Sequence, residues 1–192
     1  MVALVAQDSM VGLVSRTGRH LQRYHKGLRQ VVGCVPYRYK VVEQTALEIN
    51  KEDLEVLLIS SQKGKGMLFP KGGWETDESK IEAASRETME EAGVIGTVEC
   101  ELGKWNFKSK SHDTYYEGYM FPLRVQEQLD IWPEKNVRER AWMSVPEARK
   151  VCQHGWMKEA LDRLVERLTS QQEEEQDGEN ITEQKLVIYV VE

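Results

Sequence analysis

Three glutamates lie close together in the segment Gly72–Val94, namely Glu87, Glu90 and Glu91. Their i, i+3, i+4 spacing places all three carboxylates on one face of a helix. Three carboxylates on one turn repel one another unless a cation lies among them. Oxygen ligands of this kind suit a hard divalent cation, Mg²⁺ or Mn²⁺, and not zinc. The sequence therefore predicts a metal-binding helix, in which one of these carboxylates, or one on a nearby loop, acts as the general base.

The same segment carries signals for the two ends of this helix. The pair Gly72 and Gly73 predicts a tight turn that leaves a strand. Thr76 or Asp77 is the expected N-cap, and Gly93 is the expected C-terminal stop. The face opposite the glutamates is small and apolar, which favours packing against a sheet.

The whole segment resembles the Nudix box, in which a glycine, a glutamate, the run Arg-Glu-x-x-Glu-Glu-x-Gly and a hydrophobic residue follow at set spacing. The box positions in this sequence are Gly72, Glu78, Arg86, Glu87, Glu90, Glu91, Gly93 and Val94. Thr88 departs from the pattern, since the family usually has a larger aliphatic residue there. The alternative is a solvated, Glu-rich surface helix in a chain with 30% charged residues. The number of fixed positions favours the box.

This resemblance implies an α/β fold, specifically an α/β/α sandwich with a mixed β-sheet and a loop-helix-loop catalytic box. It implies a metal-dependent hydrolase that cleaves phosphoanhydride bonds, with Glu87, Glu90 and Glu91 as catalytic residues and metal ligands. A backbone carbonyl near Gly72 would be a further ligand. Four residues would support the box rather than contact substrate: Glu78, Arg86, Gly73 and Gly93.

Residues 14–168 are similar to plant Nudix proteins of the diadenosine and diphosphoinositol polyphosphate phosphohydrolase type. Such substrates are dense in phosphate and would need many cations. Residues 171–192 hold seven acids and one lysine, which accounts for the whole net charge of −6. The rest of the chain is neutral despite its acidic helix, so we expect a separate basic surface. The candidate phosphate-binding residues are Arg16, Arg19, Arg23, Arg29, Lys63, Lys65, Lys71, Lys104, Lys108, Lys110, Arg138 and Arg140.

Other functions remain open from the sequence. The alternatives are a nucleotide-sugar, NAD(H), ADP-ribose or RNA-cap pyrophosphatase, and a non-catalytic sensor of inositol pyrophosphates. The charge-mixed C-terminal helix argues against nucleic acid as a partner. No apolar run approaches the length of a transmembrane helix, so we expect no membrane partner.

The chain length fits one domain with tails. We expect a flexible extension at residues 1–15, the Nudix domain at residues 16–170 and an acidic, disordered tail at residues 171–192. The tail ends in the β-prone run Leu186–Val191, which could pair with a sheet edge, bind a protein partner or promote aggregation. The oligomeric state is open.

The expected compartment is the cytoplasm or nucleus, because three widely spaced cysteines indicate reduced thiols. A mitochondrial location is the alternative, since the basic segment after residue 15 partly matches a transit peptide.

Hydrophobic patterning predicts the remaining elements. The expected strands are Gln30–Tyr39, Leu54–Ser61, Met67–Pro70, Val98–Lys108, Thr114–Val125 and Arg138–Ser144. The expected helices after the box are Val145–Gln153 and Gly155–Leu168.

Overall fold

The computed structural model describes residues 14–16, 18, 20–40, 54–62, 66–108 and 114–189, with side chains as far as residue 172. Four of the expected cations, Arg19, Lys63, Lys65 and Lys110, lie outside the described residues. The strands are β1 (Tyr24–His25), β2 (Leu28–Tyr39), β3 (Leu54–Ser60), β4 (Met67–Leu68), β5 (Lys71–Gly73), β6 (Val94–Val98), β7 (Gly103–Lys108), β8 (Tyr115–Gln128) and β9 (Arg140–Ser144). The helices are α2 (Lys80–Ala92), α3 (Val145–Val151) and α4 (Gly155–Tyr189).

The strands form one mixed sheet, as predicted. Its centre is the parallel pair β2 and β8, in register from Arg29 opposite Tyr116 to Tyr37 opposite Arg124. The order along the sheet is β4-β3-β2-β8-β6. The strands β1 and β5 pair with β2, β7 pairs with β8, and β9 pairs with β3, all antiparallel.

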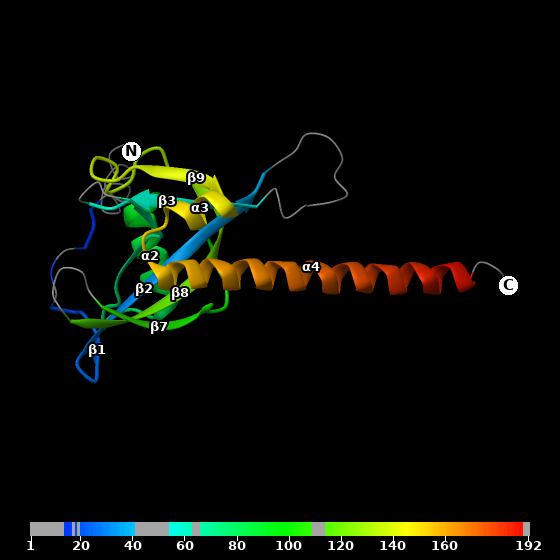
Figure 1. Ribbon diagram of the computed structural model, residues 1–192, viewed down its shortest axis with the longest axis horizontal. Helices are drawn as coiled ribbons and strands as arrows, with labels where there is room; N and C mark the ends of the chain where they lie inside the picture. Colours follow the sequence, from blue (N-terminus) through cyan, green and yellow to red (C-terminus); the bar gives the residue numbers. More distant parts are fainter. Residues whose placement is uncertain are drawn as a thin grey trace, which may run out of the picture.

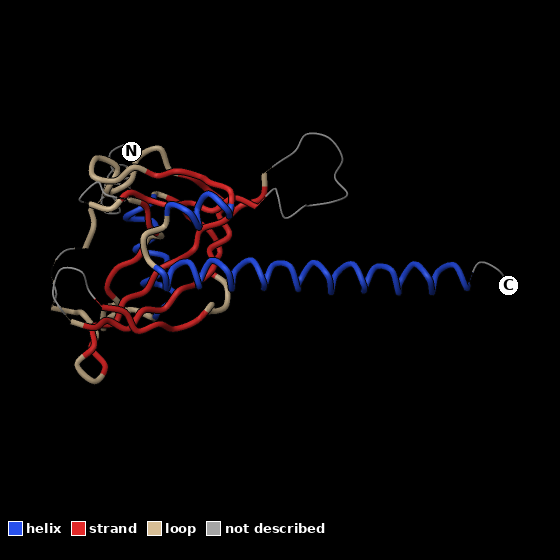
Figure 2. The backbone as a smooth tube through the Cα atoms, viewed as in Figure 1, coloured by secondary structure: helices blue, strands red, loops and turns tan. Residues whose placement is uncertain are grey.

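Helices cover both faces of the sheet (Figure 1). On one face, the Cys34 thiol of β2 donates a hydrogen bond to the Ala84 carbonyl of α2 at 3.5 Å. On the other, Phe107 of β7 stacks on Trp156 of α4 with ring centroids 4.4 Å apart. Figure 2 shows the strand layer with helical segments on either side of it. The predicted α/β/α sandwich is therefore confirmed.

The helix α2 begins later than predicted. Ser79 is its N-cap: its hydroxyl accepts from the Glu82 N–H at 3.2 Å, and the Glu82 carboxylate accepts from the Ser79 N–H at 2.8 Å. This capping box satisfies two N–H groups that a cap at Thr76 or Asp77 would leave without partners, so those predictions were wrong. The predicted stop is confirmed, since Gly93 adopts the left-handed conformation with φ 63°.

Of the expected strand Val98–Lys108, only Gly103–Lys108 forms a strand of its own, β7, while Val98 is the last residue of β6 (Val94–Val98), which was not predicted. Both β6 and β7 pair with β8, Val98 opposite Leu123 and Gly103 opposite Met120. The short segment between them keeps its contact with β8, because the Leu102 N–H donates to the Met120 carbonyl at 2.8 Å. Hydrophobic patterning cannot place such a break, because both strands carry a similar alternation.

The C-terminal helix α4 is longer than expected. It continues through residue 171 to Tyr189, where the sequence analysis expected a helix end at Leu168 and a disordered tail. Residues 171–176 are all Gln or Glu, which favour helix and give no stop signal. The run expected to be β-prone is helical from Leu186 to Tyr189. Figure 1 shows α4 projecting well past the sheet. No helix in the described residues is long and apolar enough to cross a membrane.

Candidate active site

A cavity of about 760 Å³ lies beside the N-terminal residues, β5 and α2. Its walls include the β5 residues Lys71, Gly72 and Gly73, together with Glu87 and Glu91 of α2. The cavity thus brings the box glycines and two of the three predicted metal ligands to one place. Four further predicted cations reach its walls from other segments: Arg16, Arg29, Lys108 and Arg138.

Glu87 lies directly against the main chain of β5. A Cβ atom added to Gly72 would come within 1.8 Å of Glu87 Oε2, so only glycine leaves room for this carboxylate. Glu87 Oε1 accepts a hydrogen bond from Arg86 Nη1 at 2.9 Å. Burial raises the pKa of Glu87 to about 7. The positive charge of Arg86 lowers this pKa, and the negative charge of Glu91 raises it further.

Glu91 is fully buried and has partners on both oxygens. Its Oε2 accepts from the Lys71 N–H at 2.8 Å, and its Oε1 is paired with Arg138 Nη2. Burial raises the pKa of Glu91, while Lys71 and Arg138 pull it down. Two cations on separate elements therefore stabilise this charge.

Glu90 is the third predicted ligand and does not line the cavity itself. Its Oε2 accepts from the Arg16 N–H at 3.2 Å, and its Oε1 lies 3.6 Å from Arg86 Nη1. Burial raises the pKa of Glu90. The N-terminal segment thus contacts the acidic face of α2 next to the cavity.

Arg86 holds the box together. Its guanidinium donates to both oxygens of Glu78, at 2.9 and 2.7 Å, to Glu87 and to the Gly73 carbonyl at 3.1 Å. All three groups are parts of the box, so Arg86 links Glu78, Glu87 and the main chain at Gly73 to one another. A Cβ added to Gly73 would meet the Gln22 side chain at 1.7 Å, so this glycine also permits a close approach.

The donor chemistry of α2 fits a divalent cation. Glu87, Glu90 and Glu91 offer only oxygen, and burial raises the pKa of all three. A divalent cation would offset the repulsion among these three carboxylates. In the part of the chain that the structure describes, no three acidic, histidine or cysteine side chains already enclose a metal position. Arginines are the present partners of these carboxylates, since Arg86 contacts Glu87 and Glu90, and Arg138 contacts Glu91.

The predicted cations divide into two groups. Arg29 lines the cavity, donates to Gln22 Oε1 at 2.8 Å and lies over the Tyr116 ring. Lys71 and Lys108 line it as well. Arg16 also lines it but is tied to acids of the box loop, with Nη1 2.7 Å from Glu75 Oε2.

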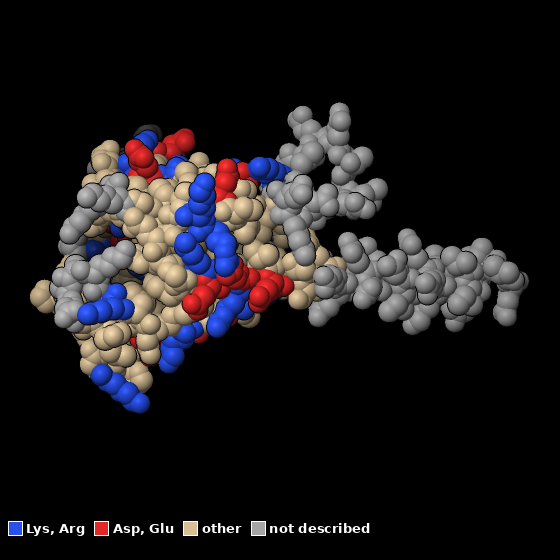
Figure 3. All heavy atoms as spheres, viewed as in Figure 1, with Lys and Arg blue, Asp and Glu red and all other residues tan. Residues whose placement is uncertain are grey.

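Three other predicted cations have structural partners and do not line this cavity. Arg23 stacks on the Trp74 ring and donates to the Glu75 and Thr76 carbonyls. Arg140 donates to the carbonyls of Ala92, Gly93 and Leu129, at and just beyond the C-terminal end of α2. Lys104 pairs with Glu117 at 3.2 Å. On the face shown in Figure 3, cationic and acidic side chains lie intermixed. The separate basic surface expected from the charge count is not seen on the described part of this face.

Sequence reasoning missed two acidic residues, Glu75 and Glu134, beside the predicted site residues. Glu75 is 7% exposed and accepts from Arg16 and from Gln22 Nε2 at 3.3 Å. Glu134 accepts from Arg138 Nε at 2.7 Å. The partners of Glu75 lie more than 50 residues away in the sequence, and the partner of Glu134 lies on a loop. No rule of sequence spacing therefore identifies either residue.

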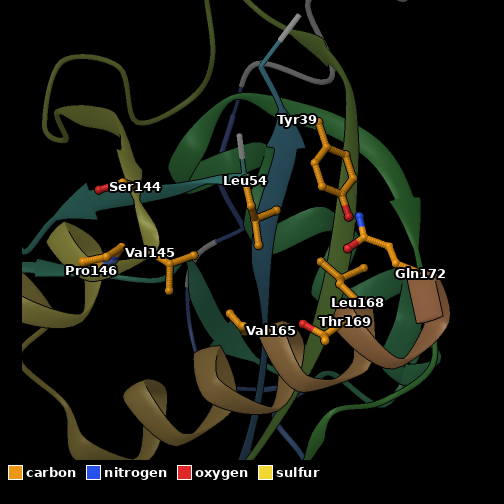
Figure 4. Close-up of a pocket in the computed structure, with 9 residues that line it drawn as sticks. All are labelled: Tyr39, Leu54, Ser144, Val145, Pro146, Val165, Leu168, Thr169 and Gln172. Atoms are coloured by element: carbon orange, nitrogen blue, oxygen red, sulfur yellow. The ribbon is translucent and has the colours of Figure 1, made fainter. Parts of the chain in front are cut away.

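A second cavity of about 380 Å³ lies among β2, β3, α3 and α4 (Figure 4). Leu54, Val145, Val165 and Leu168 give it apolar walls, and no lysine or arginine lines it among the described residues. The polar cavity beside α2 holds the predicted carboxylates and cations, so it is the candidate active site.

Comparison with known proteins gives consistent matches. The NUDIX domain family matches residues 41–168. Nudix hydrolase 17, mitochondrial, of Arabidopsis thaliana is 63% identical over 163 residues, covering 85% of this chain and 88% of that protein. Diphosphoinositol polyphosphate phosphohydrolase 2 of Rattus norvegicus is 37% identical over 144 residues, covering 72% of each. A NUDIX hydrolase structure from Nitrosomonas europaea has a TM-score of 0.56 at 22% identity, covering 71% of this chain and 88% of its own, a likeness of fold alone.

Proposed function

The chain belongs to the Nudix hydrolase family and acts on pyrophosphate bonds, and from this premise we propose a more specific activity. The protein is a metal-dependent pyrophosphohydrolase of phosphate-rich substrates, namely diphosphoinositol polyphosphates or diadenosine polyphosphates. The metal is Mg²⁺ or Mn²⁺, held by Glu87, Glu90, Glu91 and the main chain at Gly72.

One observation carries this proposal. The cavity has carboxylates of α2 on one wall and cations from three other segments around it, Arg29, Lys71 and Lys108. A substrate with several phosphates can place one phosphoanhydride bond at the carboxylates while its other phosphates reach these cations. A substrate with a single diphosphate would use fewer of them.

The chain's own residues divide the work. When bound, a divalent cation supplies charge neutralisation and a lower pKa for the attacking water. The carboxylates of α2 orient it, and Arg86 keeps Glu87 in place through its bond of 2.9 Å. The cavity cations hold the phosphates in position, which is the larger part of catalysis in phosphoryl transfer.

The similarity to a rat diphosphoinositol polyphosphate phosphohydrolase supports the phosphate-rich class. The test is a panel with Mg²⁺ that contains a diphosphoinositol polyphosphate, diadenosine penta- and hexaphosphate, ADP-ribose, NADH and capped RNA. We expect the first two classes to be hydrolysed with the highest kcat/KM. Preference for ADP-ribose, NADH or capped RNA would contradict the substrate class. Binding without turnover would indicate a sensor.

Glu90→Gln tests the catalytic assignment. The amide has the shape of the carboxylate but no charge, so it ligates a hard cation poorly. We expect turnover to fall by about a hundredfold or more, with an unchanged circular dichroism spectrum. Full activity in this variant and in Glu91→Gln would refute the assignment.

We also propose a mitochondrial location, which revises the expected cytoplasm or nucleus. The support is the name of the Arabidopsis relative, Nudix hydrolase 17, mitochondrial. A fluorescent fusion to the C-terminus should overlap a mitochondrial marker in plant cells. Overlap with chloroplasts, or a diffuse cytosolic and nuclear signal, would contradict this location.

A further inference from the structure

Arg138 is buried between α2 and the loop that precedes β9, with 7% of its side chain exposed. Its Nη2 contacts Glu91 Oε1, its Nε donates to Glu134 Oε2 at 2.7 Å, and its Nη1 donates to the Ser60 carbonyl at 3.0 Å. Each nitrogen of the guanidinium therefore has an acceptor. The arginine supplies the positive charge that a fully buried Glu91 needs.

We propose that Arg138 is the resident counter-ion of Glu91 and that it leaves this carboxylate when a divalent cation binds at α2. The inference rests on the proposed function, because it takes Glu91 as a metal ligand. It gives Arg138 a second position, in which the freed Nη2 faces the cavity.

The two oxygens of Glu91 make this exchange necessary. Oε2 already accepts the Lys71 N–H at 2.8 Å, which ties it to β5. Oε1 is the oxygen held by Arg138. A divalent cation and a guanidinium at one carboxylate oxygen repel each other strongly inside a protein. Arg138 must therefore move away from Oε1 before Glu91 can ligate a metal.

The other contacts of Arg138 allow this movement to be small. Glu134 and the Ser60 carbonyl hold Nε and Nη1. The guanidinium is a rigid plane, so Nη2 leaves Oε1 when the whole group pivots on these two contacts. Arg138 already lines the cavity that contains Arg29 and Lys71. The freed group thus joins the cations that we propose bind phosphate, and metal binding prepares the cavity for substrate.

Arg140 offers a matched control within the same segment. It also lies near the end of α2, but its guanidinium donates to the carbonyls of Ala92, Gly93 and Leu129. It covers the Trp132 ring at 3.9 Å and has no carboxylate partner among the described residues. Its loss disturbs the packing of α2 without freeing a metal ligand.

The test compares Arg138→Gln with Arg140→Gln in the full chain, using Mn²⁺ binding measured by calorimetry without substrate. The glutamine amide lies near the position of Nε, so it keeps a donor for Glu134 and removes the charge that competes at Glu91. We expect Arg138→Gln to bind Mn²⁺ about tenfold more tightly and Arg140→Gln to bind it as the wild type does. The KM of Arg138→Gln for a polyphosphate substrate should rise. Unchanged or weaker Mn²⁺ binding in Arg138→Gln would overturn the inference.

A second measurement uses the wild-type protein and does not depend on the stability of a variant. The side-chain ¹⁵N signals of arginine are followed by NMR during a Mg²⁺ titration, with Arg138 assigned through Arg138→Lys. The Arg138 signal should shift while that of Arg140 stays in place. An unmoved Arg138 at saturating Mg²⁺ overturns this inference alone. A wild-type protein that binds neither metal overturns the proposed function as well.

Discussion

Replacing Gly72 with alanine tests whether the position of the Glu87 carboxylate controls metal binding. The backbone at Gly72 has no positive φ, so alanine is sterically allowed there by the main chain. The nearest clash is with the Glu87 side chain: the new Cβ would lie 1.8 Å from Glu87 Oε2 and 2.0 Å from its Cδ. The variant therefore displaces a proposed ligand without removing it.

The size of the effect follows from these distances. Non-bonded atoms stay about 3.5 Å apart, so the carboxylate must move by about 1.5 Å or more. That movement breaks the 2.9 Å bond from Arg86. A charged hydrogen bond contributes about 1.5–3 kcal/mol to the free energy of unfolding. Its loss lowers Tm by about 3–12 °C at this chain length, where each kcal/mol corresponds to about 2–4 °C. A misplacement of this size costs about a hundredfold in kcat.

The assay combines Mn²⁺ calorimetry, Tm and phosphate release. Gly155→Ala is the control, because a Cβ there meets nothing within 4 Å. It should leave Mn²⁺ affinity and kcat unchanged. In a Glu87→Ala background, Gly72→Ala should cause no further loss, since the clashing carboxylate is gone. If Gly72→Ala alone keeps wild-type affinity and kcat, the carboxylate position does not control the site.

Four further predictions follow from the site. The pKa of Glu87 is about 7, so a proton competes with the metal for this carboxylate near neutral pH. Mg²⁺ affinity measured by calorimetry should therefore be about tenfold weaker at pH 6 than at pH 8. An equal affinity at the two pH values would contradict this prediction. Because the Glu87 pKa is raised in the folded protein, ionisation of Glu87 destabilises the metal-free protein as the pH rises from about 4.5 through 7. The Tm measured without metal should therefore fall over this pH range. A rise in Tm would contradict the raised pKa of Glu87. Arg86→Met leaves two buried carboxylates without their partner and should lower the free energy of unfolding in urea by about 3–5 kcal/mol. Lys108→Ala should raise the polyphosphate KM several-fold at constant kcat, whereas Lys104→Ala should not.

The helix α2 and its acidic face could be predicted because their signals are local. The spacing of Glu87, Glu90 and Glu91 fixes their shared face, and Gly93 fixes the end of the helix, without knowledge of the rest of the chain. The N-cap could also have been found. Ser79 followed by Glu82 is a capping-box pattern, and the competing candidates have no glutamate or glutamine three residues later.

The roles of the cations could not be predicted, because each depends on a partner distant in sequence. Arg138 and Glu91 are 47 residues apart, as are Arg140 and the Gly93 carbonyl. The two arginines stand two positions apart in one segment, yet one binds a carboxylate and the other binds helix-end carbonyls. The roles of the two arginines differ only because of the way in which β9 and the loop before it pack against α2.

These long-range contacts change how the zero net charge of residues 1–170 is interpreted. The sequence suggested that cations and acids lie on different surfaces. In the structure Arg16, Arg86 and Arg138 instead neutralise acids of the box itself. Metal-free, the cavity is left with fewer cations for phosphate than a count along the sequence implies. If a divalent cation takes over the neutralisation of α2, arginines already beside the cavity become available to substrate. Phosphate affinity should then rise with metal occupancy, which links the two binding steps in a fixed order.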